Sequence, residues 1–437
     1  AIGCLGPYRT GTAIFMTKTD KQNDIATKRL PILLFAVMSM GMGQTVVFAI
    51  IPMLGRELFA GSDLVFEFAG FALRPTTELL INLLIAAASF TYFLMTPFWG
   101  RRSDVWGRRK VIIIGLLGYS AGTVLFNILA QLGLDGVIGG WILLIALIIS
   151  RVALALVMSA SYPASMAYIV DVTSIDNRTK GISKLAAANG IGSMCGPILA
   201  SLAGISFLAP LYLQGFLTAL AAVAVYLWMP ATSIARVRGS VPRKLRFFDA
   251  RYRYYLFVSL VMFTMMGMVQ QTLGFYFQDR LGLSGVDAAR YFSFAMMASS
   301  GAMLAAQLVV VQRLGLSPST LLKLGLPIAA VGYLLVGQAD SFTLLAVAMS
   351  AFGFGMGLAG PGTSTMATLQ VSADEQGSLA GLLSAAPGLG YVLGPLLGGW
   401  LYGLELTYPY HLAGLIMLML ALFNVFYLRQ SAEKGHK

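Results

Sequence analysis

The sequence predicts an all-α integral membrane protein, with twelve transmembrane helices in two pseudo-symmetric six-helix halves. Hydrophobic residues make up 57% of the 437 positions and charged residues only 11%, whereas a soluble chain carries about 25% charged residues. The apolar residues come in runs of roughly twenty, the length needed to cross a ~30 Å hydrocarbon core. Lysine and arginine gather in alternate connections between these runs. Each run must be a helix, because lipid offers an open backbone no hydrogen-bond partner.

The apolar runs also fix the order of the segments. The spans are predicted at 31–55, 78–99, 111–132, 141–166, 183–206, 210–230, 254–278, 290–311, 321–338, 342–368, 377–402 and 410–428. The longest connection between spans on the side of the termini carries seven positive charges and one acid, Asp249. We therefore expect a cytoplasmic N-terminal segment, a first half, a cytoplasmic linker, a second half and a cytoplasmic tail, at 1–30, 31–230, 231–253, 254–429 and 430–437.

Lysine and arginine predict the orientation, because cytoplasmic connections carry an excess of both. With the N-terminus inside, 25 of the 30 fall in inner segments and only four in outer ones, namely Arg56, Arg74, Arg280 and Arg290. Both termini are therefore expected to be cytoplasmic, and the short loops favour a bacterial inner (plasma) membrane. This distribution explains the net charge of +12 without nucleic acid as a partner.

Few residues are available for a metal or catalytic site. Two cysteines and two histidines are too few and too dispersed for a disulfide framework, a metal site or a histidine triad; they are Cys4, Cys195, His411 and His436. We therefore expect no metal, no cofactor and no enzymatic activity, and a monomer in the lipid bilayer. Residues 1–15 lack the apolar run of a secretory signal, and we interpret Met16 as the native start.

A short basic segment, GRRSDVWGRRK at residues 100–110, joins spans 2 and 3. Its glycines permit a tight turn, and Asp104 is the one acid among five bases. Asp104 can lie against a helix N-terminus, where the macrodipole favours an anion, and the bases can pair with acids of neighbouring inner loops. Ion pairs that form in one state and break in another act as a gate. The alternative is a basic loop that serves only topology.

This segment resembles the signature loop of the major facilitator superfamily, and the resemblance extends over nearly the whole chain. Residues 167–171 with Arg178 resemble the connection between spans 4 and 5 in the drug-efflux branch of that family. The segment from Pro52 to Leu58 resembles the end of span 1 in tetracycline and multidrug exporters. Residues 192–197 resemble the antiporter motif of span 5, which in that branch is tied to export. The resemblance implies a drug/proton antiporter with solute bound between two repeated halves near the midplane.

The two halves repeat one motif, since Gly-x-x-x-Gly-Pro occurs at 192–197 and again at 390–395. Close helix packing between small residues is an equal alternative to gating for these motifs. The loop at 312–315, which would repeat the signature, has lost its acid. The candidate gating residues are Gly100, Asp104, Gly107, Arg108, Arg109, Asp171, Arg178, Gly192, Gly196, Pro197, Gly394 and Pro395.

Arg151 is the one basic residue deep inside a predicted span, since Lys184, Arg290 and Lys323 lie at span ends. An unpaired arginine at that depth costs at least ~2.5 kcal/mol, so it should face a water-filled cavity or have a partner. No acid falls in the middle of a span, which favours a neutral or anionic solute over a cation. The matching arginine of the family is implicated in proton coupling. The expected solute-binding residues are Gln44, Asn82, Arg151, Tyr162, Asn189, Gln270, Gln271, Phe275, Tyr276, Gln307 and Tyr391.

Proton coupling has three candidate groups: Arg151, and Glu78 and Asp279 at outer span ends. Together these features predict a secondary active transporter that exports a small organic solute by alternating access, with proton antiport. The solute is an antibiotic or a secreted metabolite such as a siderophore. Two alternatives stay open, namely proton-coupled uptake on the same fold and a membrane enzyme acting on lipid. Such an enzyme usually carries clustered Asp or His for metal and phosphate, and none is visible in the sequence.

Overall fold

The computed structural model describes residues 29–59, 66–68, 71–73, 75–173, 175–230, 246, 248–372 and 375–435. The expectation about Met16 therefore lies outside the described residues. The first half contains α2 (Leu30–Leu58), α3 (Thr77–Trp106), α4 (Arg108–Leu134), α5 (Gly140–Met158), α6 (Ser161–Val172), α7 (Ile175–Ala200), a 3-10 turn η1 (Ser201–Gly204) and α8 (Ala209–Trp228). The second half contains α9 (Arg253–Leu281), α10 (Gly285–Ala305), a π-helical continuation η2 (Ala306–Val311), α11 (Pro318–Gln338), α12 (Phe342–Thr368), α13 (Gln376–Leu404) and α14 (Tyr408–Gly435).

The predicted all-helical membrane fold is confirmed. Among the described residues, ten helical segments are long and apolar enough to cross a membrane, counting α5 with α6 and α10 with η2 as one segment each. The helices α7 and α13 complete the twelve. Several helices outlast the apolar run that predicts them, and α3 continues to Trp106 through Arg101 and Arg102. Hydropathy marks where a helix leaves the hydrocarbon, whereas the helix itself ends where its backbone hydrogen bonding ends.

Short polar side chains explain where several helices begin. The Thr76 hydroxyl accepts a hydrogen bond from the Leu79 amide at 3.3 Å, which caps α3. Ser317 caps α11 in the same way, just before Pro318. Such caps satisfy amides that have no partner inside the helix. One glycine, Gly107 at φ 92°, separates α3 from α4 in a conformation that other residues rarely adopt.

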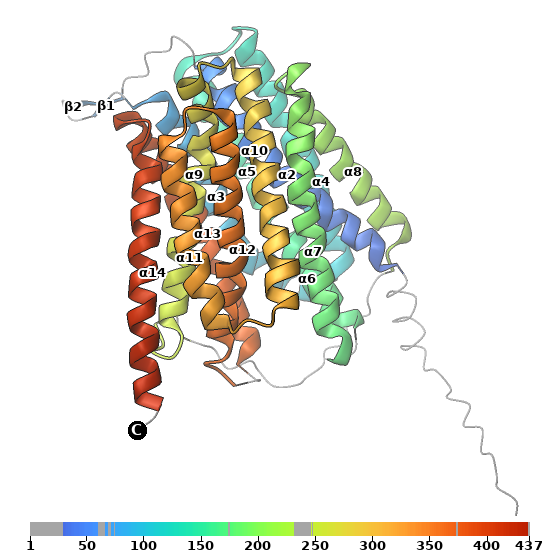
Figure 1. Ribbon diagram of the computed structural model, residues 1–437. Helices are drawn as coiled ribbons and strands as arrows, with labels where there is room; N and C mark the ends of the chain where they lie inside the picture. Colours follow the sequence, from blue (N-terminus) through green and yellow to red (C-terminus); the bar gives the residue numbers. More distant parts are fainter. Residues whose placement is uncertain are drawn as a thin grey trace, which may run out of the picture.

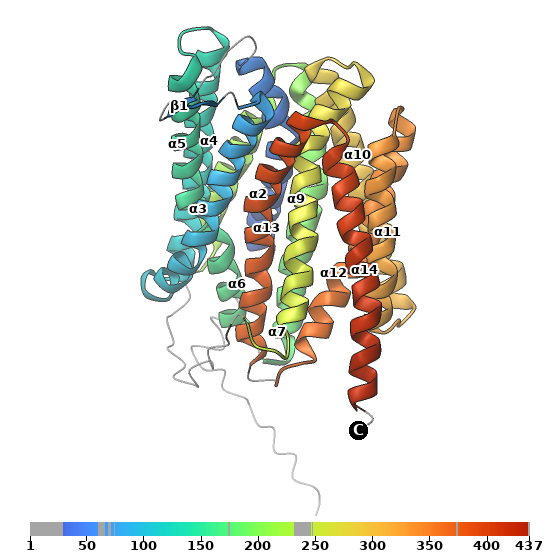
Figure 2. The same cartoon turned by 90° about the vertical axis from the view of Figure 1, so that its left-hand side faces the viewer.

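The two ends of the helical bundle are distinct (Figures 1 and 2). The start of α2, the end of α8, the start of α9 and the C-terminus lie at one end, which we call the terminal face. A two-stranded antiparallel hairpin, β1 (Phe66–Phe68) with β2 (Phe71–Leu73), lies at the other end, which we call the hairpin face. The sequence did not predict this hairpin, because its segment is short and lies in a loop between spans.

The repeated Gly-x-x-x-Gly-Pro motifs make equivalent contacts in the two halves. A Cβ added at Gly196 on α7 would lie 2.6 Å from the Met42 carbonyl oxygen of α2. A Cβ at Gly394 on α13 would lie 2.5 Å from the Thr264 carbonyl oxygen of α9. Gly192, one turn before Gly196, packs as tightly on α2. In each half the motif thus brings the fifth span directly against the backbone of the first span, as small residues allow.

The halves approach each other along α3 and α13, more closely at one end than at the other. Near the hairpin face, a Cβ at Gly403 would lie 3.1 Å from the Thr76 hydroxyl, and further along a Cβ at Gly388 would lie 3.0 Å from the Phe93 ring. Near the terminal face, a Cβ at Gly100 would meet no atom within 4 Å. Figure 2 shows the two helices diverging toward the terminal face.

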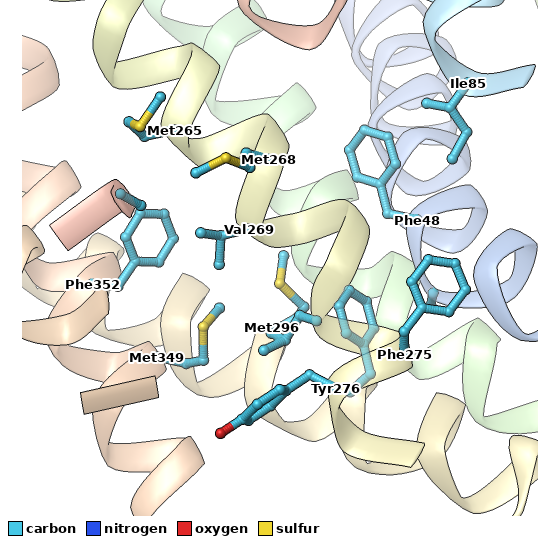
Figure 3. Packing of buried hydrophobic residues seen from close by; sticks show 14 of the residues in the cluster. Phe48, Ile85, Met265, Met268, Val269, Phe275, Tyr276, Met296, Met349 and Phe352 are labelled. Atoms are coloured by element: carbon cyan, nitrogen blue, oxygen red, sulfur yellow. The ribbon is translucent and has the colours of Figure 1, made fainter. Parts of the chain in front are cut away.

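One hydrophobic core runs through both halves. Its buried residues include Phe48 of α2 and Ile85 of α3 from the first half, and Met268 and Phe275 of α9 from the second. Figure 3 shows Phe48, Ile85 and Phe275 among the residues of this cluster. Because these contacts lie between the halves, this core must separate along the interface if the halves rock apart.

Candidate functional site

A cluster of charged side chains joins the two halves at the hairpin face. Arg56, in the last turn of α2, donates hydrogen bonds to Glu78 of α3 and to Asp279 of α9, each at 2.6 Å. It also donates to the amide oxygen of Gln278 at 2.9 Å. The Tyr402 hydroxyl of α13 donates to Asp279 at 2.7 Å. We call Arg56, Glu78, Gln278, Asp279 and Tyr402 the hairpin-face gate, since two belong to the first half and three to the second.

The surroundings of this gate strengthen its ion pairs. The side chains of Arg56, Glu78 and Asp279 are only 19%, 16% and 29% exposed. The guanidinium carbon of Arg56 lies 4.7 Å from the centre of the Phe275 ring, which adds a cation–π contact. Hydrogen bonds between charged groups are stronger than neutral ones, and removing one partner leaves a partly buried charge unpaired. The cluster therefore holds this end of the interface closed.

A second layer of contact lies below the gate, toward the middle of the bundle. The ring of Phe48 on α2 stacks on Tyr391 of α13 at 5.6 Å between centroids, with 18° between the ring planes. The Tyr391 hydroxyl donates to Gln270 of α9 at 3.1 Å. A Cβ at Gly274 of α9 would lie 3.4 Å from the Met53 side chain of α2. From the gate to this aromatic pair, the halves are therefore in contact.

Gln44 marks where that contact ends. It lies one helical turn from Phe48 on the terminal side, and residues four apart in a helix share a face. Gln44 is exposed although it is midway along α2, whose residues are otherwise mostly buried. The same face of α2 is thus packed against the second half at Phe48 and open at Gln44. The predicted solute-binding glutamine is therefore accessible, whereas Phe48, one turn nearer the hairpin face, is enclosed.

Ion pairs at the terminal face stay within each half, among the residues that the structure describes. Arg108 on α4 pairs with Asp104 at 2.5 Å and with Asp171 of α6 at 3.0 Å, all in the first half. Arg251, just before α9, pairs with Asp249 at 2.9 Å and with Glu375, before α13, at 2.8 Å. No described ion pair crosses between the halves here. Among the described residues, the ion pairs that join the two halves therefore lie at the hairpin face.

The cluster of Arg251, Asp249 and Glu375 stabilises the charged forms of its members. The Arg251 guanidinium, by hydrogen bonding, lowers the pKa of the Glu375 carboxyl to about 2, and the Ser372 amide and hydroxyl act in the same direction. Hydrogen bonds from Arg251 also lower the pKa of Asp249. The pKa of Arg251 itself is raised by its hydrogen bonds to Asp249 and then to Glu375. The end of the connection before α9 is thus fixed to the start of α13.

Arg151 lies on α5, as predicted, and has no acidic partner among the described residues. Its guanidinium carbon lies 5.7 Å from the centre of the Phe126 ring of α4, and its Nε is buried with no hydrogen-bond partner. The residue as a whole is only partly buried. The partly exposed side chain of Arg151 is therefore left without a counter-ion among the described residues.

The other predicted solute-binding residues fall into three groups. Tyr162 of α6, Asn189 of α7 and Gln307 in η2 are partly exposed. Asn82 and Gln271 are fully buried, and neither amide group has a hydrogen-bond partner. The last group is packed in the closed region: Gln270 and Tyr391 bind each other, Phe275 supports Arg56, and Tyr276 donates to the Ala339 carbonyl.

The predicted gating residues also separate by role. Arg109 donates to the carbonyl of Tyr226 at the end of α8. Gly107 forms the turn, and Gly100 faces open space. The glycines of the Gly-Pro motifs pack closely within each half, as shown above for Gly192, Gly196 and Gly394, and Pro197 and Pro395 lie inside their helices. The side chain of Arg178 lies outside the described residues.

Sequence reasoning missed the lock itself. It named Glu78 and Asp279 as coupling candidates, but not Arg56, which binds both, nor Gln278 and Tyr402. Arg56 is separated from Asp279 by 223 residues, so no local pattern could pair them. One feature of the sequence could have indicated the lock. Few charged residues lie on the outer side, so a cation and two acids at outer span ends have few other partners.

Two six-helix halves that a cluster of charged side chains joins at one end are the arrangement of membrane transporters of the alternating-access class. The family model described as "Major Facilitator Superfamily" matches residues 33–359 and 310–437. The chain therefore belongs to the major facilitator superfamily, which confirms the resemblance seen in the sequence.

Several characterised relatives are similar to this chain. Multidrug resistance protein 2 of Bacillus subtilis is 24% identical over 77% of this chain and 83% of its own length. The class C tetracycline resistance protein of Escherichia coli is 27% identical over 72% of this chain and 78% of its own length. Solute carrier family 22 member 18 of Mus musculus is 26% identical over 89% of this chain and 93% of its own length.

Solved structures support the fold. The crystal structure of the human organic anion transporter MFSD10 (TETRAN) has a TM-score of 0.63 at 17% identity, covering 92% of this chain and 99% of its own. A bacterial homologue of the lysosomal transporter Spinster, in an inward-facing and occupied conformation, has a TM-score of 0.68 at 15% identity, covering 92% and 97%.

Proposed function

We propose that this protein exports a small organic solute, neutral or anionic, by alternating access coupled to proton antiport. The observation that carries this proposal is the asymmetry of the interface: Arg56 locks the hairpin face across the halves, whereas Gln44 is exposed toward the terminal face. We place both termini and the linker 231–253 in the cytoplasm, and the protein as a monomer in the inner (plasma) membrane. The conformation described is then open to the cytoplasm, from which an exporter takes its solute.

The charges of the interior support the proposed solute class. All acids among the described residues lie at helix ends or in connections, and none lies midway along a helix. Arg151 has no acidic partner there and keeps an unpaired donor. A carboxylate or another anionic group on the solute would supply the missing partner, whereas a cation would meet repulsion. Antibiotics remain the first candidates, because related proteins are named for multidrug and tetracycline resistance; a secreted metabolite such as a siderophore remains the second.

The hairpin-face gate offers a physical route to proton coupling. With Glu78 and Asp279 ionised, Arg56 holds the halves together. A proton on either carboxylate removes one charge partner and weakens the lock, which favours opening of the hairpin face.

Flux into inside-out vesicles under an imposed proton gradient tests the function. We expect gradient-driven accumulation of anionic or neutral compounds from a panel that also includes organic cations. Arg151→Ala should abolish accumulation of the anions, while Arg313→Ala, an exposed arginine at the terminal face, should leave it unchanged. Accumulation of cations alone would contradict the proposed solute class. Accumulation only in right-side-out vesicles would instead indicate uptake.

A further inference from the structure

The exposed face of α3 ends, near the terminal face, in a cluster of basic and aromatic residues that belong to neither the hairpin-face gate nor the predicted solute-binding set. Phe90, Leu94 and Phe98 are spaced four residues apart and are 48%, 54% and 38% exposed. Residues with this spacing share one face of a helix, and an exposed apolar face of this kind is suited to contact with lipid. Four residues further on, the same stripe reaches Arg102, which is exposed. The apolar surface of α3 therefore passes directly into a cation at the level of the terminal face.

Aromatic rings hold this cation in place. The guanidinium carbon of Arg102 lies 5.7 Å from the centre of the Phe98 ring and 4.9 Å from that of Trp106. Trp106 is 43% exposed and contacts the ring of Trp99 edge-on. Trp99 is itself fixed by a hydrogen bond from its indole nitrogen to the Leu156 carbonyl at 2.7 Å. We call Phe98, Arg101, Arg102 and Trp106 the α3 patch.

The positive charge of the α3 patch is not neutralised by the described protein. Asp104, the nearest acid in sequence, pairs with Arg108, and Asp171 pairs with that same arginine. Arg101 and Arg102 form no ion pair among the described residues, and both are exposed. Their hydrogen-bond donors are thus directed to the surroundings, where water and lipid head groups are present. Exposed tryptophan is typical of this level of a membrane protein.

We propose that the α3 patch binds an anionic phospholipid. Arginine is suited to phosphate, because its planar guanidinium presents parallel donors to two oxygens. The acyl chains would lie along Phe98, Leu94 and Phe90, and the indole of Trp106 would lie beside the head group. Anionic lipids are attracted to basic residues at the membrane surface by about 1 kcal/mol per residue. The site lies one turn from the Asp104–Arg108–Asp171 ion pairs, so a bound lipid fixes the end of α3 that these ion pairs hold.

The second half provides an internal control. The corresponding connection between α10 and α11 carries one exposed arginine, Arg313, with no aromatic contact to its guanidinium among the described residues. If net positive charge alone attracted anionic lipid, Arg313 would contribute as Arg102 does. If the combination of apolar stripe, rings and guanidinium is required, only Arg102 matters.

Quenching of tryptophan fluorescence by brominated lipid tests the site. The full-length protein is placed in phosphatidylcholine vesicles that contain either brominated phosphatidylglycerol or brominated phosphatidylcholine at the same fraction. The contribution of Trp106 is isolated by difference from Trp106→Phe. We expect about fivefold enrichment of phosphatidylglycerol next to Trp106, equivalent to the ~1 kcal/mol of one basic residue. Arg102→Gln should remove the enrichment, and Arg313→Gln should retain it.

Three outcomes would overturn the proposal. Equal quenching by the two lipids would show that the patch has no preference for the anionic head group. An equal loss of enrichment in Arg102→Gln and Arg313→Gln would show that net charge alone attracts the lipid. Loss of the enrichment on adding inorganic phosphate at constant ionic strength would assign the site to a soluble phosphate. Size-exclusion profiles of both variants verify that they remain folded.

Discussion

The Arg56 guanidinium lies 2.6 Å from the Asp279 carboxylate, and this ion pair joins the first half of the protein to the second. Arg56 also binds Glu78 of its own half, so a single cation is shared by two acids, one in each half. The terminal face has no cross-half ion pair of this kind among the described residues. The ion pair between Arg56 and Asp279 therefore indicates that the hairpin face is closed.

A disulfide should trap the closed hairpin face. A Cβ at Gly403 would lie 3.4 Å from the Cβ of Thr76, near the 3.5–4.5 Å typical of disulfides. We expect Thr76→Cys/Gly403→Cys to cross-link on mild oxidation and to stop transport, with recovery after reduction. Electrophoretic mobility after cleavage in the linker and vesicle flux measure the two effects. Each single variant is the control, and full flux with a complete cross-link would contradict closure at this contact.

Removal of the Asp279 charge should open the hairpin face more often. Charged hydrogen bonds contribute about 1.5–3 kcal/mol, so Asp279→Asn is expected to raise the open population roughly tenfold. Labelling of Asn82→Cys with a membrane-impermeant maleimide from the hairpin side measures this, because Asn82 is fully buried in the closed state. Glu57→Gln removes a charge next to Arg56 that makes no described ion pair, and it should label as slowly as the parent. Equal rates in the two variants would contradict the lock.

Gly196 and Gly190 should differ in how well each tolerates substitution by alanine. A Cβ at Gly196 would meet α2, whereas a Cβ at Gly190 on the same helix meets no atom within 4 Å. Overpacking of this kind costs typically 1–3 kcal/mol. We expect Gly196→Ala to lower the Tm in detergent by several degrees and Gly190→Ala to leave it unchanged or slightly raised. Matching Tm values would show that α7 can shift away from α2 without loss.

Low pH should remove the contribution of Glu375 to the stability of the folded protein. Its pKa is lowered from the ordinary 4.5 to about 2, so its stabilising effect is present above pH ~4.5 and is lost as the pH falls toward 2. The Tm difference between the parent and Glu375→Gln should therefore be constant from pH 7 to 5 and shrink below that. Arg251→Gln should behave like Glu375→Gln, while Arg253→Gln, an exposed neighbour without a described ion pair, should not. A Tm difference that grows as the pH falls would contradict the lowered pKa of Glu375.

Much of the fold was predictable because the bilayer imposes simple rules on a sequence. A helix must present roughly twenty apolar residues, and this length fixed the order of the twelve spans. The repeated Gly-x-x-x-Gly-Pro motif predicted related halves, and Gly196 and Gly394 make equivalent contacts. The hairpin at 66–73 and the exact ends of α3 were not predictable in this way, because neither depends on the hydrocarbon boundary.

The site was predictable only in part. Arg151 and Gln44 were identifiable because a polar residue in a membrane helix is costly and needs a reason. The side of α2 on which Gln44 lies, and the opening there, depend on how two halves meet, which no local pattern encodes. Tyr276 illustrates the same point, since its hydroxyl is committed to Ala339 inside the second half.

The sequence by itself determined that this chain crosses a membrane twelve times, belongs to a transporter family and keeps acids out of its interior, because hydrophobicity and charge act residue by residue. Only the tertiary structure decided that Arg56, Glu78, Asp279 and Tyr402 form one lock between the halves. Those four side chains come from four helices in both halves, and an ion pair depends on distance in space rather than on separation along the chain.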